Sequence, residues 1–588
     1  MAKSKTQWLE KRHELLWNEL GEQEVSGEKI KSVLKDKGNV SEDSIAVILS
    51  ELKKNGFIET KLDPKDSRKR IYSVKNPKTL IRETFDLKYE TLTRSDINNI
   101  LKKAADLIRT RVDYKFILIL LFLKRISDKW EEEYKWAVKE AEEEYGLSEN
   151  LAIEEAKKES YHEFNLPEEY LWESLRKEVH ELPEKFSNAL KKIGELNPEL
   201  KDIVDNADFI QFTQNPENAE ILRQLVELFS EKRLHKVSAD VLGDAYEWIL
   251  SYFAPSQAKE GEVYSPREVI QLIVEILKPA PEKSIYDPAS ASNGMLIISY
   301  NYVKEMHGED KADRLFLYGQ EANHKTLALG RMNMYIHGIR NFKLENGDTL
   351  TRPKFKKKDG IDTFDLVIAN PPWNQDGYDE QHLKKAEFWK SRFSYGFTPR
   401  QSADWAWIQH MVASAKEDGK VGVIIDNGCL FRGGKEKTIR QSFIEDDLIE
   451  TVILLPEKLF YNTGAPGAVI ILNKSKPKER KDKIMFINAS SEYEKHPEVR
   501  KLNILAQQNI ANIRDVHDNF TEKEGFSRVV DKSEIEENEY NLNVSLYCFP
   551  EEEEEDIDIN KEWKEAKELE KERGELNNKI EKFLKEVG

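Results

Sequence analysis

The chain of 588 residues has few cysteines and no long apolar run. Its two cysteines, Cys429 and Cys548, are too few for a disulfide framework or a cysteine zinc site. The longest apolar block, Phe116 to Leu123, is far shorter than the roughly 20 residues that a membrane helix needs. The amino terminus has no apolar signal core. These absences predict a cytoplasmic protein that contacts no membrane.

Two common nucleotide-binding motifs are also absent. The G-x-G-x-x-G spacing of dinucleotide-binding folds does not occur after the first predicted strand of the sheet described below. The segment Arg432-Gly433-Gly434-Lys435 lacks the earlier glycine and the following hydroxyl residue of a P-loop.

The composition is that of a globular protein with a highly charged surface, 39% hydrophobic and 34% charged. The net charge of −18 argues against a surface that grips nucleic acid everywhere. A local basic track, or a partner that supplies one, is compatible with it. The length predicts three or four domains.

Residues 1–76 are expected to form a winged-helix-like domain. Three helical patterns precede a β-hairpin, with strands at Phe57–Thr60 and Arg70–Val74. Basic residues Arg68, Lys69 and Arg70 on the wing could contact DNA phosphates, and docking on a protein is the equal alternative. Residues 77–250 are predicted to be a helical domain.

From residue 251 short apolar strands alternate with helices, which predicts an α/β fold with a doubly wound, Rossmann-like sheet across residues 251–475. Residues 476–550 would extend this domain. Residues 551–588 form an acidic hinge and a predicted docking helix. The apolar stripe of that helix comprises Trp563, Leu569, Leu576, Ile580 and Phe583. The predicted strands are Ile285–Tyr286, Leu315–Tyr318, Phe342–Leu344, Phe364–Ala369, Val421–Ile425, Thr451–Leu455 and Ala468–Leu472.

A buried strand that ends in a polar turn is the clearest candidate site. The apolar run Phe364–Ala369 is typical of a parallel strand, and Asn370-Pro371-Pro372-Trp373 follows at once. Open α/β sheets bind ligands at the carboxyl ends of their strands. The prolines exclude a helix and remove two backbone donors. The turn therefore offers an amide, a carbonyl and a ring to a flat ligand with an amino group, although a plain strand end with a packing tryptophan would have the same sequence.

Other predicted strand ends carry groups suited to a nucleotide-like cofactor. Small residues from Asp287 to Gly294 let the backbone approach a ligand. Glu321 stands where acidic residues commonly bind ribose hydroxyls, and Asp348 is placed to meet an adenine ring. The candidate cofactor-binding residues are Tyr264, Ser265, Pro266, Asp287, Ala289, Ser290, Ser292, Asn293, Gly294, Glu321, Asp348 and Asn370.

In this order the segments resemble an amino-methyltransferase that uses S-adenosylmethionine. With their flanks, from about residue 95 to 550, they resemble the modification subunit of a type I restriction–modification system. The likeness is carried by Phe122–Asp128, Val263–Arg267, Tyr318–Asn323, Met332–Gly338, Gly347–Leu350, Phe364–Trp373, Arg432–Glu436, Leu459–Gly464 and Tyr540–Asn543.

The resemblance implies an N6-adenine DNA methyltransferase whose cofactor is S-adenosyl-L-methionine, with no metal. Its catalytic residues would be Asn370, Pro371, Pro372 and Trp373. The Asn370 amide and the Pro371 carbonyl would accept hydrogen bonds from the adenine amino group, and Trp373 would stack on a base flipped out of the duplex. The implied partners are double-stranded DNA, a specificity subunit that binds two modification subunits, and a restriction subunit.

The cofactor loop departs from the family pattern. Ala291 stands where the family usually has glycine, and Asn293 where it has another small residue. Asparagine tolerates a left-handed backbone and alanine adopts one at modest cost, so we expect cofactor binding to be retained with altered affinity. The alternative is a catalytically weakened DNA-binding or assembly subunit that acts through the winged helix.

Other methylation chemistries fit less well. Formation of 5-methylcytosine needs a nucleophilic cysteine, usually after proline, whereas Cys429 follows Gly428 and Cys548 follows Tyr547. Methylation of cytosine N4 uses a similar turn with a different first residue, and Asn370 favours adenine. Methylation of RNA or of a protein glutamine through the same turn is disfavoured by the flanking segments.

Overall fold

The structure is a computed structural model, and it falls into two compact units. One comprises Met1–Phe253 with His324–Ile339, and the other comprises Ala254–Asn323 with Arg340–Gly588. None of the helices within the described ranges is long and apolar enough to span a membrane. The described residues are 12–13, 15–21, 23–38, 40, 42–54, 57–63, 66–74, 94–108, 113–176, 181–201, 216–230, 234, 242–243, 245–246, 248–249, 252–253, 265–460, 463–497, 499, 501–549, 563, 567, 569–571, 573–574 and 576.

The amino-terminal part of the first unit contains the predicted helices and hairpin. Strands β2 and β3 pair antiparallel, and β1 joins the far side of β3. Ile30, Leu34 and Ile48 are buried in its core. The expected phosphate contacts of Arg68 and Lys69 fall on side chains outside the described part. The elements are β1 (Val25–Ser26), α2 (Gly27–Asp36), α3 (Glu42–Lys54), β2 (Ile58–Asp63) and β3 (Asp66–Val74).

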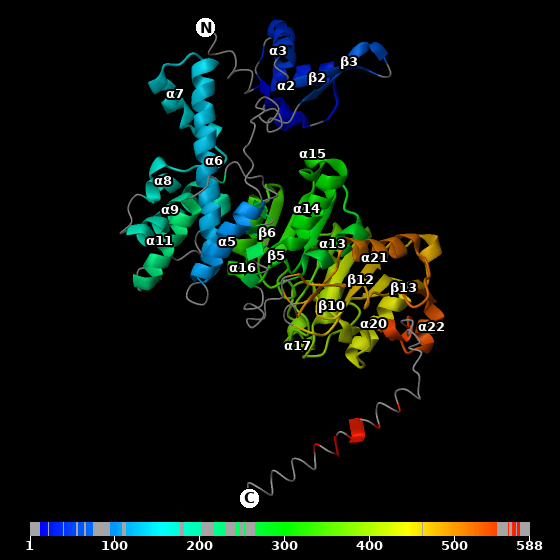
Figure 1. Cartoon of the computed structure of the whole chain (residues 1–588). Coiled ribbons are helices and arrows are strands. Elements are labelled where there is room, and N and C mark those ends of the chain that lie inside the picture. Colours follow the sequence, from blue (N-terminus) through cyan, green and yellow to red (C-terminus); the bar gives the residue numbers. More distant parts are fainter. Residues whose placement is uncertain are drawn as a thin grey trace, which may run out of the picture. The chain divides into compact units, whose positions relative to one another are not determined.

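The helical part is built on the long helix α6 (Lys115–Glu143), with α5, α8 and α11 beside it (Figure 1). Every side chain from Phe116 to Lys124 is buried, because this stretch is apolar on every side. Lys124 forms a buried ion pair with Asp128, 2.5 Å apart, and Asp128 also accepts from the backbone N–H of Leu234. The other helices are α5 (Arg94–Ile108), α7 (Glu149–Ala156), α8 (Trp172–Leu175), α9 (Leu182–Leu196) and α11 (Pro216–Ser230).

One helix of this unit lies, in sequence, between two strands of the other. Helix α16 (His324–Ile336) packs on α6, and its Leu329 carbonyl accepts a hydrogen bond from the Tyr246 hydroxyl at 2.8 Å. The Tyr335 ring meets Phe164 edge-on.

The second unit is built on a nine-stranded sheet with the order β16-β13-β11-β12-β10-β9-β4-β5-β6. Strands β6, β5, β4, β9 and β10 are parallel, and β12 is antiparallel to both of its neighbours. The doubly wound α/β prediction is confirmed. The strands are β4 (Ser284–Asp287), β5 (Phe316–Glu321), β6 (Phe342–Asn346), β9 (Phe364–Ala369), β10 (Ala415–Asp426), β11 (Ile449–Leu454), β12 (Gly467–Asn473), β13 (Lys483–Asn488) and β16 (Ser527–Asp531).

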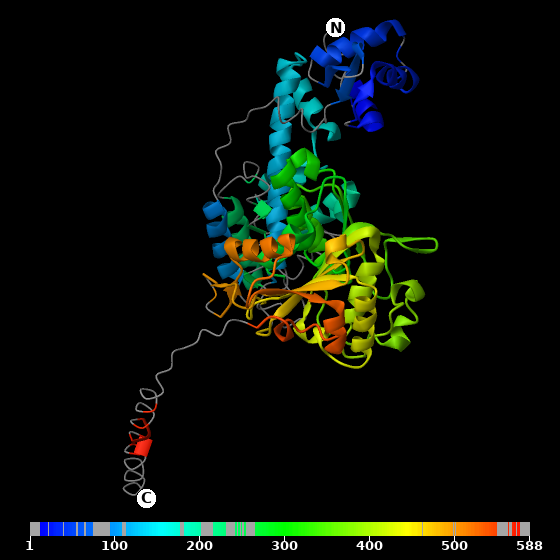
Figure 2. The ribbon, with the colours of Figure 1, turned by 90° about the vertical axis from the view of Figure 1, so that its right-hand side faces the viewer.

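Helices cover both faces of this sheet. In β10, Val421 and Val423 pack with Trp405 of α19, whereas a Cβ on Gly422 would lie 2.6 Å from Ile273 of α13. Alternate residues of a strand point to opposite faces, so α13 and α19 lie on opposite sides. Helix α21 packs on α13 and β13 (Figure 2). The helices are α13 (Arg267–Leu277), α14 (Gly294–His307), α15 (Glu309–Ala312), α17 (Glu380–Leu383), α18 (Trp389–Arg392), α19 (Asp404–Ala413), α20 (Lys435–Glu445), α21 (Gln507–Asn519) and α22 (Lys532–Glu537).

The sheet is wider than predicted, because β13 and β16 were missed. Both lie in residues 476–550, which the sequence assigned only to an extension of the domain. Two small antiparallel pairs stand outside the sheet, β7 (Lys356–Lys357) with β8 (Gly360–Ile361) and β14 (Glu494–Lys495) with β15 (Asn503–Ile504). In the predicted docking helix, Trp563, Leu569 and Leu576 are helical and exposed. Ile580 and Phe583 lie outside the described residues.

Candidate active site

The order of the sheet brings two predicted sites together. The chain passes from β4 outward to β5 and β6, then returns to add β9 and β10 on the other side of β4. The point where the direction reverses lies between β4 and β9, whose Tyr286 and Val367 pair in parallel register. Ligands bind at such a point, beyond the carboxyl ends of the strands. Asp287 at the end of β4 and Asn370 after β9 both lie there.

The amide of Asn370 is held on both sides. Its Nδ2 donates to Ser265 Oγ at 2.8 Å, and its Oδ1 accepts from the indole Nε1–H of Trp373 at 2.9 Å. An indole N–H can only donate, which fixes the oxygen of the amide on that side. Ser265 lies just before helix α13 and was predicted to bind the cofactor. It thus contacts Asn370, which belongs to the predicted catalytic residues. Asn370 itself is 8% exposed.

The Trp373 ring is packed rather than free. It meets Phe460 edge-on, with ring centroids 4.7 Å apart and planes at 68°. Gly467 at the start of β12 permits this packing, because a Cβ there would lie 2.9 Å from Trp373 and 2.8 Å from Phe460. Phe460 and Gly467 were not predicted as site residues, although the segment that contains Phe460 carried the family resemblance.

The cofactor loop between β4 and α14 has an unusual backbone. Ala291 and Asn293 adopt positive φ, 41° and 65°. Asn293 is fully buried, and no residue within the described ranges bonds either atom of its amide. The Ser290 hydroxyl is likewise buried without such a bond. An unsatisfied buried polar group costs about 1–3 kcal/mol, so these groups favour a ligand that satisfies them.

Two carboxylates border this loop. Asp287 accepts from the N–H of Ala289 at 3.0 Å, and Glu321 accepts from the N–H of Ala291 at 3.0 Å. Burial raises the pKa of Asp287 to about 8, with a contribution from the charge of Glu321, and the Ala289 hydrogen bond opposes the rise. At neutral pH this carboxyl group is therefore mostly protonated.

The segment around Asp348 follows β6 and is fixed by buried side chains that the sequence did not single out. Asp348 accepts from the N–H of Leu350 at 3.0 Å and from the Thr351 hydroxyl. The fully buried Gln320 donates to the Gly347 carbonyl at 3.0 Å, and Arg392, only 1% exposed, donates to the Thr349 carbonyl at 2.7 Å. A buried arginine that bonds three carbonyls has no sequence signature, since its partners are backbone atoms.

The remaining predicted residues are placed as follows. Pro266 is the N-cap of α13, Gly294 is the first residue of α14, and Pro372 lies between the buried Pro371 and Trp373. Ser292 lies in the cofactor loop, and Tyr264 lies outside the described residues. Both cysteines are buried, and burial raises the pKa of Cys429 well above its usual value and that of Cys548 to about 11. A raised pKa makes these thiols poor nucleophiles.

Two family profiles match the chain in succession. The HsdM N-terminal domain matches residues 97–229, and the N-6 DNA methylase family matches residues 237–556. The second match covers more than half of the chain and includes every candidate site residue. The chain belongs to the N-6 DNA methylase family. Its predicted identity as an adenine-specific DNA methyltransferase is thereby confirmed.

Individual relatives of this methylase carry the same description. The type I restriction enzyme MjaVII methylase subunit of Methanocaldococcus jannaschii is 43% identical over 97% of this chain and 96% of that protein. The MjaVIII methylase subunit of the same organism is 42% identical over 98% and 97%. The crystal structure of a type I restriction-modification system methyltransferase subunit from Streptococcus thermophilus is 26% identical, with a TM-score of 0.67, over 78% of this chain and all of that one. The methylase is thus a type I methylase subunit.

Proposed function

We propose that the methylase transfers the methyl group of S-adenosyl-L-methionine to N6 of an adenine flipped out of duplex DNA. The observation that carries this proposal is the Asn370 amide, which stands at the reversal point of the sheet beside a loop with unsatisfied polar groups. When bound, the cofactor would supply an electrophilic methyl group. The lone pair of the adenine nitrogen would form the new bond to that carbon as the carbon–sulfur bond breaks with its electron pair kept by sulfur, and the proton that the nitrogen releases would pass to water.

The residues of the base-side turn orient the amino group. Asn370 Oδ1 and the Pro371 carbonyl accept hydrogen bonds from the two N6 hydrogens, which directs the nitrogen lone pair toward the methyl donor. The two prolines keep the backbone of this turn fixed, because Pro371 and Pro372 have restricted φ. The Trp373 ring supplies the stacking surface for the base.

In the structure Asn370 Oδ1 already accepts a hydrogen bond from Trp373, and we infer that base binding exchanges this partner, because the ring must also move to stack on the base. The adenine amino group replaces the indole N–H on Asn370 Oδ1, and the indole moves onto the face of the base. The edge-on contact with Phe460 marks the position that the ring leaves. Ser265 holds the amide in place throughout, because it bonds the other end of the group, Nδ2.

The cofactor side has the chemistry that the proposed cofactor needs. S-adenosylmethionine supplies an electrophilic methyl group on a positively charged sulfur. Glu321 borders the loop and provides negative charge, and Asp287, with its pKa raised to about 8, provides a hydrogen-bond acceptor. The Asn293 amide and the Ser290 hydroxyl, which no described residue bonds, provide further polar groups. We assign ribose binding to Glu321 and adenine contact to Asp348, with Ala289, Ser292, Gly294, Tyr264 and Pro266 lining the same site.

The methylase acts as part of a larger complex. Its net charge of −18 makes it a poor DNA-binding protein alone, so we assign sequence recognition to a specificity subunit that binds two copies of it, and cleavage to a restriction subunit. The exposed apolar residues Trp563, Leu569 and Leu576 suit a docking helix for such a partner. We place the complex in the cytoplasm with its DNA substrate.

Co-expression with the products of its neighbouring genes, followed by mapping of methylated bases in host DNA, tests the proposal. We expect N6-methyladenine at a defined sequence with the wild type and none with Asn370→Ala. Calorimetry should show that Asn370→Ala still binds S-adenosylmethionine. Methyl groups on cytosine, or no methylation by the folded wild type, would refute the proposal. Loss of cofactor binding in the variant would show that Asn370 belongs to the cofactor site.

A further inference from the structure

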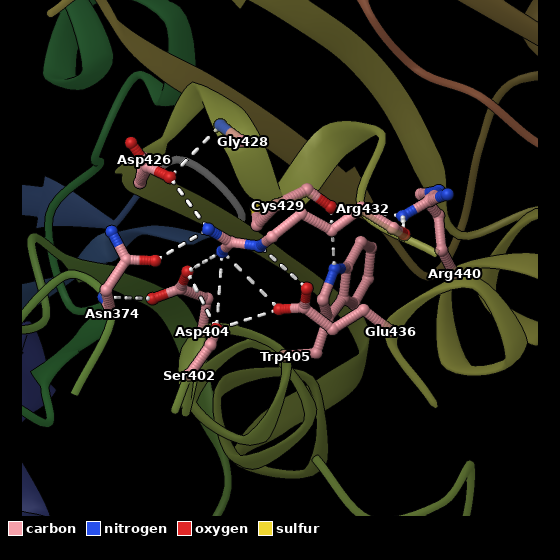
Figure 3. Close-up of polar contacts among 10 residues, drawn as sticks. All are labelled: Asn374, Ser402, Asp404, Trp405, Asp426, Gly428, Cys429, Arg432, Glu436 and Arg440. Carbon is pink, nitrogen blue, oxygen red and sulfur yellow. Dashed lines mark hydrogen bonds and ion pairs between the residues drawn. The ribbon is translucent and has the colours of Figure 1, made fainter. Parts of the chain in front are cut away.

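A group of polar side chains lies just beyond the catalytic turn and meets at one guanidinium (Figure 3). Arg432 follows β10, on the loop that leads to α20, and its partners come from four other segments. We call this group the Arg432 cluster. It comprises Asn374, Ser402, Asp404, Asp426, Arg432 and Glu436.

All three nitrogens of the guanidinium donate within the cluster. Nε donates to Glu436 at 2.7 Å, Nη2 to Asp404 at 2.6 Å, and Nη1 to the side-chain oxygen of Asn374 at 2.6 Å. Nη1 also lies 3.1 Å from Asp426 at the end of β10. Because a guanidinium is planar and rigid, contacts in several directions fix its position and hence the relative positions of its partners.

The cluster holds more negative charge than one arginine balances. Asp404 and Glu436 are buried, with side chains 1% and 2% exposed, and Asp426 is 19% exposed. Burial raises the pKa of Asp404 to about 6, although the Asn374 N–H and Arg432 lower it. Buried ion pairs are often no more stabilising than apolar side chains of the same volume. A gain in stability is therefore a weak explanation for these buried charges. The fixed geometry that they impose on their neighbours explains them better.

The cluster forms two hydrogen bonds with Asn374, the residue that follows the turn Asn370–Trp373. The backbone N–H of Asn374 donates to Asp404 at 2.9 Å, and its side-chain oxygen accepts from Arg432. Asn374 directly follows Trp373 and has a φ of 51°, a conformation that turns the chain away from the turn. The turn is thus fixed at one end by β9 and at the other by the Arg432 cluster.

We propose that Arg432, with Asp404, is a positioning residue for methyl transfer, which acts through Asn374 to set the place of Trp373 and the Asn370 amide. This inference rests on the proposed function of that turn. We do not place Arg432 in contact with the base. It defines where the turn ends, so that Trp373 can exchange its bond to Asn370 for the base without the loop itself moving.

The alternative for an arginine at this edge of the sheet is a contact with DNA phosphate, and its neighbour on the loop provides the matched control. Lys435 is 52% exposed and forms an ion pair with Glu380, with 3.6 Å between nitrogen and oxygen. Loss of a phosphate contact raises KM for DNA and makes KM less dependent on salt, and Lys435→Gln should show this effect if the loop meets DNA. If Arg432 positions the turn, its substitution lowers kcat and leaves KM for DNA and the salt dependence of KM unchanged.

The test uses Arg432→Gln, Asn374→Gly and the double variant in complex with the specificity subunit. Glycine keeps the positive φ and the backbone bond to Asp404 but removes the Arg432 contact. We expect kcat to fall about 100-fold in Arg432→Gln and about tenfold in Asn374→Gly, since displacements of about 1 Å cost this much. The double variant should be no slower than Arg432→Gln, because both changes break the same hydrogen bond, the one between Arg432 and Asn374. Cofactor binding, measured by calorimetry, should stay at the wild-type value.

The outcomes separate this inference from the proposed function. An inactive wild-type complex would refute the function itself. An active wild type with unchanged kcat in Asn374→Gly, or with independent, multiplying losses in the double variant, would refute the positioning role. A raised KM for DNA with a weaker salt dependence than the wild type in Arg432→Gln would show a phosphate contact instead. If Arg432→Gln does not fold, Asn374→Gly decides alone, because it leaves every charge of the cluster paired as before.

Discussion

The cofactor loop and the catalytic turn stand on adjacent strands, yet they treat their polar groups in opposite ways. In the loop, the buried Asn293 amide and Ser290 hydroxyl have no bond within the described residues. In the turn, both ends of the Asn370 amide are bonded. The loop can therefore gain hydrogen-bond partners when the cofactor binds, whereas the proposed binding of the base exchanges one hydrogen-bond partner of the turn. The cofactor side should respond to changes in affinity, and the base side to changes in rate.

The largest effect should come from crowding the turn. Gly467→Ala places a methyl group 2.9 Å from Trp373 and 2.8 Å from Phe460, so the rings must shift. We expect kcat to fall by about 10- to 100-fold with unchanged cofactor affinity. Gly464→Ala, which would meet no atom within 4 Å, is the control and should leave both unchanged. A loss of cofactor affinity in Gly467→Ala would break the division between the two regions.

The second prediction concerns pH at the cofactor loop. The pKa of Asp287, about 8, exceeds the 3.8 of the unfolded chain, so the folded protein keeps a proton that the unfolded chain releases. Its contribution to stability is present below pH 4 and is lost as pH rises to about 8. A positively charged cofactor favours the ionised group, so its affinity should rise up to about tenfold per unit from pH 6 to 8.

Asp287→Asn supplies the comparison for this pH profile. It removes the titrating group while it keeps an acceptor for the Ala289 N–H. The slope of cofactor affinity against pH, measured by calorimetry, should be shallower in the variant. Equal slopes would mean that another group titrates, and kcat at saturating cofactor should not share the dependence.

A smaller change should follow from Trp373→Phe, which retains a stacking ring but lacks the indole N–H. Without that donor Asn370 Oδ1 is free for adenine, and one hydrogen bond is worth about 1 kcal/mol. We expect kcat/KM for DNA to rise about fivefold, as measured in steady-state methylation assays. Trp389→Phe serves as the control for loss of an indole elsewhere. A fall in kcat/KM would mean that the indole contributes more as a base platform than it hinders as a bonded partner.

The smallest effect should be seen with Ala291→Gly. A left-handed backbone costs an L-residue about 1–2 kcal/mol, part of which glycine returns through its freedom in the unfolded chain. The variant should gain up to about 1 kcal/mol in stability. Ala289→Gly, where φ is not positive, should lose stability in the same thermal unfolding experiment. A loss in both would show that Ala291 is not strained.

Local patterns explain why the main strands and the catalytic turn were predictable. An apolar run that stops at Asn370-Pro371 is visible in the sequence, and so is the small-residue loop that carries Ala291 and Asn293. Strand β16 was missed because Ser527–Asp531 is short and lies at an edge, where few residues need be apolar. Strand β13 was missed even though its residues Ile484–Ile487 form an apolar run.

The bonds within the site were beyond reach for a different reason. Ser265 and Asn370 are 105 residues apart, and Arg432 and Asn374 are 58 apart. Such pairs meet only through the strand order, which places β10 beside β9 and β9 beside β4. Sequence patterns report which face of an element is buried, but not which side chains from different elements converge.

Helix α16 has a practical consequence for how the protein can be dissected. The chain leaves the sheet after β5, forms a helix that belongs to the helical unit, and returns for β6. A fragment that begins after Phe253 would carry this helix without Phe164 and Tyr246, two of its recorded contacts. Such a fragment would leave the Tyr335 ring and the Leu329 carbonyl without these contacts. A single truncation of the gene therefore cannot produce the second unit without helix α16.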